Sequence, residues 1–166
     1  MLYEVGTGQT TRLQVGNAVR SVAFSANAKV LAEGTSDGRV MLYHFITGQT
    51  TTLSGSSGAG VNSIAFQPGG KIIATGDDSG RIVLYNLSTG QTTTLNESSA
   101  VHSVAFSPDG KILASGNDNG QVLAINSLVG TSGVVSTLCR ELGGQNMTHS
   151  QWKQYIIDQP YRATCR

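Results

Sequence analysis

The chain has 166 residues, a net charge of +1 and only 13% charged residues, which is enough length for one domain of ordinary size. No basic stripe is visible, and no run approaches the about 20 apolar residues of a membrane span, so we expect neither a nucleic-acid nor a membrane partner. The ordinary apolar content of 39% argues against disorder. The N-terminus MLYEVGTGQ lacks the basic start and apolar core of a secretory signal, so we expect a cytoplasmic location.

The sequence repeats itself with a period near forty residues. The segment SVAF occurs three times, at steps of 42 and 40 residues, as Ser21–Phe24, Ser63–Phe66 and Ser103–Phe106. The segment GQT returns at steps of 40 and 42 residues, beginning at Gly8, Gly48 and Gly90. A period of this length indicates that one supersecondary unit has been copied.

The clearest copy of the unit is Val61–Leu95, in which turns that bear glycine separate four short runs. Such runs predict an antiparallel four-stranded meander. The first three runs are apolar on consecutive residues, as in Ile82–Tyr85, and this pattern buries both faces of a sheet. A β-sandwich buries one face of each sheet, whereas radially stacked sheets bury two. The sequence therefore predicts a mainly β fold of the propeller type.

Taken in chain order, the copies are incomplete at both ends. Met1–Leu13 matches only the third and fourth strands of a unit. Val19–Leu53 is blade one, Val61–Leu95 is blade two, and Val101–Asn126 supplies three strands of blade three. We expect residues 1–128 to form a partial propeller of about three blades plus a half blade, and residues 129–166 to form a small helical tail.

The turn after the first strand differs between copies. In blade two it contains Pro68-Gly69-Gly70, where Pro presets φ and Gly accepts a positive φ. In blade one the equivalent residues are Ala26-Asn27-Ala28, with neither Pro nor Gly. Asn tolerates a positive φ, so we expect this turn to survive through Asn27.

The body of the chain resembles the WD-repeat propellers over roughly Met1 to Asn126. The pattern SVAFSPDGKILASG at Ser103–Gly116 carries the resemblance, with partners at Ser63–Gly76 and Ser21–Gly34. The family's Trp-Asp pair and its Gly-His dipeptide are both absent, so we expect the His/Asp/Trp hydrogen-bond network of such blades to be broken. The four places of the Trp-Asp pair hold Tyr3-Glu4, Tyr43-His44, Tyr85-Asn86 and Ile125-Asn126.

The tail changes from a strand period to a helix period. Val134, Leu138 and Leu142 are spaced by four, which predicts a helix over Val134–Leu142. A capping box of Thr148 and Gln151 predicts a second helix, near His149–Ile157. Trp152 stands at a staple position of that helix, and we expect it to fold the tail onto blade three.

The tail also carries a second resemblance. Its segments Asn146–Thr148, Gln151-Trp152, Pro160-Tyr161 and Thr164-Cys165 look like the region that follows the last WD repeat in many large cyanobacterial and other bacterial proteins. That resemblance implies that a signalling NTPase, a caspase-like peptidase or a protein kinase precedes the propeller. It also implies that Cys139 and Cys165 meet as a disulfide or redox pair, and the alternative is two separate reduced thiols.

No constellation of residues points to catalysis, a cofactor or a metal. The three histidines, His44, His102 and His149, occupy unrelated places, and function needs converging groups. Asp77–Gly80 and Asn117–Gly120 hint at calcium, but they lack the EF-hand spacing and recur between the second and third strands, so we interpret them as turns.

We therefore predict a non-enzymatic protein-interaction module, with the loop-bearing rim as its binding surface. The polar residues that differ between copies at equivalent places are the candidate rim residues, namely Arg20, Asn62, His102 and Glu33. We expect six aromatic residues to be structural, with Phe66 and Phe106 buried between blades: Phe24, Phe66, Phe106, Tyr43, Tyr85 and Trp152. The alternatives are a decayed fragment with no separate function and a hydrolase that uses the central channel.

Too few blades are present to close a ring, because propellers have four to eight. One solution is that the chain is the C-terminal piece of a longer propeller, which its start in the middle of a strand pattern favours. A second is that two copies pair, helped by the edge strands Met1–Val5 and Val122–Asn126. A third is that the tail covers one end and the other end aggregates.

Overall fold

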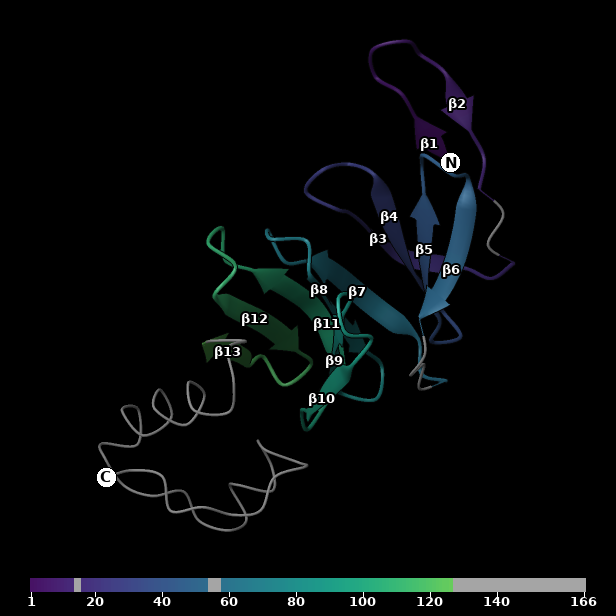
Figure 1. Cartoon of the computed structure of the whole chain (residues 1–166). Helices are drawn as coiled ribbons and strands as arrows, with labels where there is room; N and C mark the ends of the chain where they lie inside the picture. The colour runs from purple at the N-terminus through teal and green to yellow at the C-terminus, as the bar shows by residue number, and fades with distance from the viewer. Residues whose placement is uncertain (14–15, 54–57, 127–166) are drawn as a thin grey trace.

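The computed structural model describes residues 1–13, 16–53 and 58–126. All regular structure in this part of the chain is β, with thirteen strands in four sheets. The sheets follow one another in a fan along the chain, and the small N-terminal sheet projects from one end (Figure 1). The architecture is therefore propeller-like, and none of the described residues forms a helix long and apolar enough to cross a membrane.

The strand bounds follow the predicted units closely. The half blade is the hairpin of β1 (Leu2–Tyr3) and β2 (Thr10–Thr11). Blade one consists of β3 (Val19–Phe24), β4 (Val30–Thr35), β5 (Val40–His44) and β6 (Gln49–Leu53). Blade two consists of β7 (Val61–Phe66), β8 (Ile72–Asp77), β9 (Arg81–Asn86) and β10 (Thr92–Asn96). Blade three consists of β11 (Val101–Phe106), β12 (Ile112–Asn117) and β13 (Val122–Asn126).

Each blade is an antiparallel meander in sequence order, which confirms the predicted meanders. The first strands β3, β7 and β11 form one edge of their sheets, and β3 and β11 both contact β7. The polar fourth strands β6 and β10 form the opposite edge of blades one and two. Only blade two therefore has a described blade on each of its two faces.

Two apolar cores lie between the blades, and each is built from residues of two neighbouring sheets. Short branched side chains dominate both cores because facing sheets pack about 10 Å apart. The core between blades one and two contains Ala32, Val40, Leu42, Val61, Ile64, Ile73, Val83 and Tyr85. The core between blades two and three contains Ala74, Ile82, Leu84, Val101, Val104 and Leu113.

The aromatic residues expected to be structural differ in burial. Tyr85 is buried in the first core, as expected. Phe66 and Phe106 pack against the two cores but stay half-buried, so the expectation of full burial is wrong. Phe24 is 55% exposed, because no described blade lies on its side of blade one. It stacks instead on Phe45, with ring centroids 6.0 Å apart; Tyr43 is half-buried.

The first turn of blade one survives, but through a different residue from the expected one. Ala28 adopts the positive φ, at 53°, where Gly70 and Gly110 stand in the other blades. Asn27 instead uses its side-chain oxygen, which accepts hydrogen bonds from Ser25 Oγ at 2.8 Å and from the Lys29 amide at 3.0 Å. A left-handed conformation costs a residue with a Cβ about 1–2 kcal/mol, so this turn is strained.

Other residues replace the family's hydrogen-bond network in blade three. Glu97, in the connection that precedes β11, accepts hydrogen bonds from Ser115 Oγ and, at 2.5 Å, from Asn117 Nδ2. Ser115 is buried in β12. The connection is thus tied to the middle of the blade, and the expectation that blades lack such a network does not hold for blade three.

The predicted tail lies outside the described residues. This applies to both expected helices, to the docking of Trp152 and to the meeting of Cys139 with Cys165. The expected domain division at residue 128 has its second part there as well.

Candidate functional site

Three of the four candidate rim residues occupy one repeated backbone feature. In each blade the register between the first and second strands shifts by one residue, between Val19 and Ser21, Val61 and Ser63, and Val101 and Ser103. The residues inside these bulges are Arg20, Asn62 and His102. A β-bulge re-aims the side chain of its extra residue. The three side chains therefore leave the core pattern and line one rim of the fan.

The structure brings Arg20 and Asn62 together across the boundary between blades one and two. Arg20 Nη1 donates hydrogen bonds to Asn62 Oδ1 at 2.9 Å and to Asp78 Oδ2 at 2.7 Å. Asn62 Nδ2 donates to the other carboxylate oxygen of Asp78 at 2.8 Å and to the Val101 carbonyl at 3.2 Å. Each polar group thus contacts the next, and the cluster reaches from blade one to the start of blade three.

His102 repeats the arrangement within blade three. Its Nε2 lies 2.5 Å from Asp118 Oδ1, and both side chains are more than half exposed. Asp118 occupies the same place in the turn between β12 and β13 as Asp78 does between β8 and β9. We call the five residues Arg20, Asn62, Asp78, His102 and Asp118 the rim cluster.

A repeated backbone hydrogen bond holds the two acidic residues at the rim. The Asp78 amide donates to the Gly60 carbonyl at 3.0 Å, and the Asp118 amide donates to the Ala100 carbonyl at 3.1 Å. Each turn is thereby fixed against the connection that precedes the first strand of its blade. Gly60 also leaves room for Arg20, because a Cβ there would lie 2.4 Å from Arg20 Nη1. The cluster is positioned by backbone rather than by its side chains alone.

The electrostatics of the cluster favour a charged Asp78. Hydrogen bonds from Asn62 and from Arg20 lower the pKa of the Asp78 carboxyl below its usual range. Arg20 and Asp78 are about 40% exposed, so solvent screens their ion pair. The pair contributes more to the orientation of the two side chains than to stability.

Glu33 does not belong to the rim, which corrects the prediction. It is 4% exposed in the middle strand β4, on the face of blade one that points away from blade two. Burial raises the pKa of its carboxyl, and the charge of the Met1 N-terminus acts in the opposite direction. The equivalent residues in blades two and three are Thr75 and Ser115, so only blade one places an acid here.

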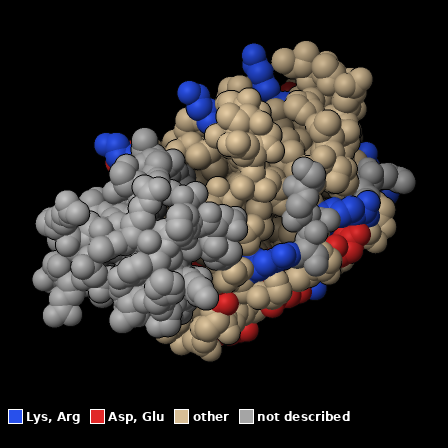
Figure 2. Space-filling model, turned by 60° about the horizontal axis from the view of Figure 1, so that its bottom comes forward, with Lys and Arg blue, Asp and Glu red and all other residues tan. Residues whose placement is uncertain are grey.

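The rim cluster offers hydrogen-bond donors and acceptors of both charge signs rather than a single-sign patch. Figure 2 shows basic and acidic side chains side by side along one edge of the molecule. Within residues 1–13, 16–53 and 58–126 no group of three or more His, Cys, Asp or Glu side chains could hold a metal ion. Mixed charge of this kind suits complementary contacts with another protein surface.

Sequence reasoning assigned Asp78 and Asp118 to turns and missed their second role. The turn assignment is correct, since Asp77 accepts hydrogen bonds from the amides of Ser79 and Arg81 at 2.9 Å each. Asp78 stands one residue further on and points to the rim. The signal that could have found it is the recurrence of Asp 40 residues later, at the same place relative to the bulge.

Comparisons with known proteins agree with this geometry. Residues 48–86 and 90–124 match the family described as WD domain, G-beta repeat. A solved structure titled as the β-propeller domain of Cps50 (Swd1) from Myceliophteria thermophila is similar, with a TM-score of 0.65, 18% sequence identity and coverage of 72% of this chain. This chain spans 38% of that chain. No match was found among curated proteins. The two matches support the WD-repeat propeller family, and the structural likeness shows the fold alone.

Proposed function

We propose that this chain is a non-catalytic protein-interaction segment that binds a partner protein through the rim cluster. The observation that carries the proposal is the repeated bulge, which presents Arg20, Asn62 and His102 at one rim without disturbing the cores. The WD40 matches support it, because such propellers generally mediate protein–protein interaction. Three different side chains at one repeated backbone position form a surface that can recognise a specific sequence of groups.

The proposal has a wider part that rests on the tail's resemblance. In it the chain is the C-terminal recognition or regulatory part of a larger bacterial signalling protein in the cytoplasm. An NTPase, a caspase-like peptidase or a kinase would be the effector whose activity the bound partner controls. The support is the set of tail residues around Trp152 and Pro160-Tyr161, which lie outside the described residues.

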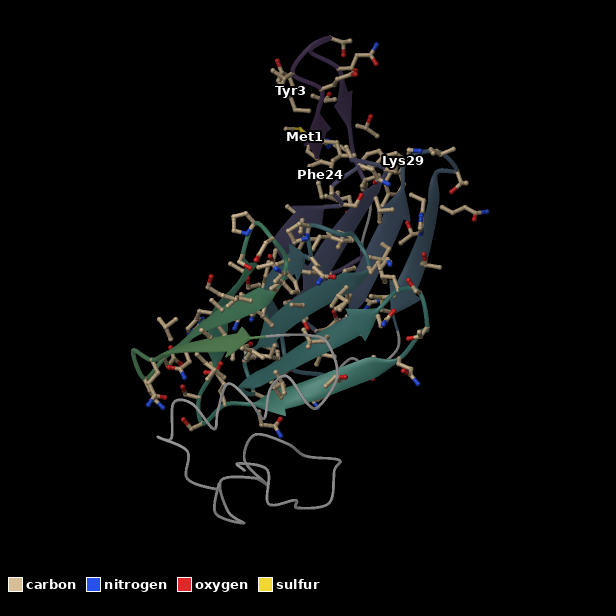
Figure 3. All side chains as sticks on the ribbon, turned by 60° about the vertical axis from the view of Figure 1, so that its left-hand side comes forward. Met1, Tyr3, Phe24 and Lys29 are labelled. Atoms are coloured by element: carbon tan, nitrogen blue, oxygen red, sulfur yellow. The ribbon has the colours of Figure 1, made fainter. Side chains whose placement is uncertain are left out.

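The test is cross-linking of the tagged chain in an extract of its own organism, followed by mass spectrometry. A double variant, Arg20→Ala with His102→Ala, removes the rim charges. The control Lys29→Ala removes an exposed charge from the turn after β3, at the opposite end of that strand from Arg20 (Figure 3). We expect at least one protein to be captured by the wild type and the control but about tenfold less by the double variant. Equal capture by all three forms would contradict the rim as the binding surface.

A further inference from the structure

The two closed interfaces between blades share one knob-and-hole contact. A glycine in the second strand of each earlier blade receives a valine that begins the first strand of the later blade. A Cβ added at Gly34 would lie 2.5 Å from Val61 Cγ1, and one added at Gly76 would lie 2.5 Å from Val101 Cγ1. Both valines are buried. Only glycine leaves room for this close approach.

The same interfaces share one hydrogen bond. The Ile64 amide donates to Ser21 Oγ at 3.1 Å, and the Val104 amide donates to Ser63 Oγ at 3.0 Å. In both, a first-strand amide of the later blade meets a first-strand serine of the earlier blade. The repeat therefore encodes a complete set of contacts between neighbours, with a donor side and an acceptor side.

The donor side of blade one has no blade against it among the described residues. Val19 is 42% exposed, although its equivalents Val61 and Val101 are buried. Val22 is 57% exposed, although Ile64 and Val104 are buried. Phe24 belongs to the same surface and lies at the end of the molecule that carries Met1 (Figure 3). The hairpin β1–β2 does not cover this surface, which we call the donor face and define by Val19, Val22 and Phe24.

The acceptor side of blade three is equally open. Within residues 1–13, 16–53 and 58–126 nothing lies within 4 Å of a Cβ placed at Gly116, the equivalent of Gly34 and Gly76. Ser103, the equivalent acceptor serine, is exposed. Val122 is 77% exposed, although Val40 and Ile82 at its position are buried. We call the surface of Ser103, Gly116 and Val122 the acceptor face.

We infer that a second copy of this chain docks head to tail, with the donor face of each copy on the acceptor face of the other. Val19 of one copy fills the space at Gly116 of the next, and its Val22 amide donates to Ser103 Oγ. The argument for a second copy is that the two open faces carry the two halves of one contact that the chain makes twice within itself. None of the six face residues is charged, so docking leaves none of their side chains with a buried charge.

Two copies docked in this way contribute six blades, which lies within the four to eight blades of closed propellers. The contact is heterologous, because different surfaces of the two copies meet, and it is satisfied everywhere only if the ring closes. A preceding blade in a longer chain would use the same donor face. For the chain of 166 residues, the second copy supplies that contact.

The test is the mass of the full chain by multi-angle light scattering at micromolar concentration. We expect a dimer. Gly116→Ala should raise the dimer dissociation constant at least tenfold and leave the fold intact, because Gly116 does not adopt a positive φ and its Cβ would meet none of the described residues. The matched control is Gly69→Ala, at another open glycine without a positive φ, in the turn after β7. We expect it to leave the mass unchanged.

A mixing experiment separates head-to-tail docking from other association. Val19→Lys blocks the donor face, and alone it should be monomeric, as Gly116→Ala alone should be. A mixture of the two variants retains one good donor face and one good acceptor face, so it should form a dimer. A monomeric wild type would overturn the proposal. So would a mixture that stays monomeric, a dimer that survives both substitutions, or growth into larger assemblies instead of a closed pair.

Discussion

Blade two and blade one have nearly the same sequence pattern but differ in what covers them. Blade two lies between two neighbours, and its Ile64 and Ile82, one on each face, are both buried. Blade one has a described blade on one face only, so Val22, the equivalent of Ile64, is exposed. The apolar pattern of a strand thus states which faces can be buried. The neighbours decide which faces are buried, and the energetic weight of each position follows from them.

The largest expected effect compares one position in two blades. Ile82→Ala empties a fully buried site between blades two and three and should lower the free energy of unfolding by about 2–5 kcal/mol. Val122→Ala alters the equivalent exposed site and should cost less than about 0.5 kcal/mol, measured at protein concentrations where the chain is monomeric. Urea denaturation measures both. Equal losses would show that Val122 is covered and would remove the distinction between the two blades.

The aromatic residues at the ends of the first strands give a second comparison. Phe66 packs half-buried against the first core, so Phe66→Ala should cost about 2 kcal/mol, less than the 3–5 kcal/mol of a fully buried Phe. Phe24→Ala loses mainly the stack on Phe45 and should cost about 1 kcal/mol or less. Thermal unfolding of the two variants should rank them in this order. The opposite order would mean that the donor face is covered in solution.

A third comparison concerns the turn after the first strand. Ala28→Gly relieves a left-handed residue and should raise the free energy of unfolding by about 1 kcal/mol, even after the extra entropy that Gly adds to the unfolded chain. Gly70→Ala creates in blade two the strain that blade one already carries, and it should destabilise by a similar amount. If Ala28→Gly were destabilising, the turn would not hold the positive φ in solution.

The smallest effect is the pH dependence of the rim cluster. The pKa of Asp78 is lowered in the folded chain, so its contribution is present above the unfolded pKa of about 3.9 and is lost as pH falls through the lower folded value. Asp78→Asn should therefore reduce stability at pH 7 by less than about 1 kcal/mol, because the pair is solvent-exposed, and the loss should vanish at lower pH. Arg20→Ala should weaken the same dependence. A loss that persists at the lowest pH would point to packing instead of charge.

The repeat predicted much of the fold, because the period and the turn glycines fix strand order. The strand bounds of blade two lie within two residues of the runs expected from Val61 to Leu95. The burial of Phe24 and Phe106 could not be predicted as well, since it depends on which neighbours are present. The strain at Ala28 was missed because Asn27, the better left-handed residue, is used as a hydrogen-bond acceptor.

The site was predicted in part, for a physical reason. Variation at equivalent places found Arg20, Asn62 and His102, because a bulge residue is free of the core pattern. The same criterion wrongly included Glu33, since a polar residue in a middle strand can also vary when its face is enclosed differently. Asp78 and Asp118 were missed because turn chemistry alone explained their residue types.

The bulge in the first strand separates two kinds of inheritance in this chain. Residues on either side of it, such as Val61 and Ser63, are bound by the geometry of the next blade. The residue inside it carries a cation, an amide or an imidazole on the same backbone. Duplication of the unit therefore copies the scaffold and leaves one position per copy open to independent change. An array of such units can acquire a new recognition surface one side chain at a time, while every intermediate still folds.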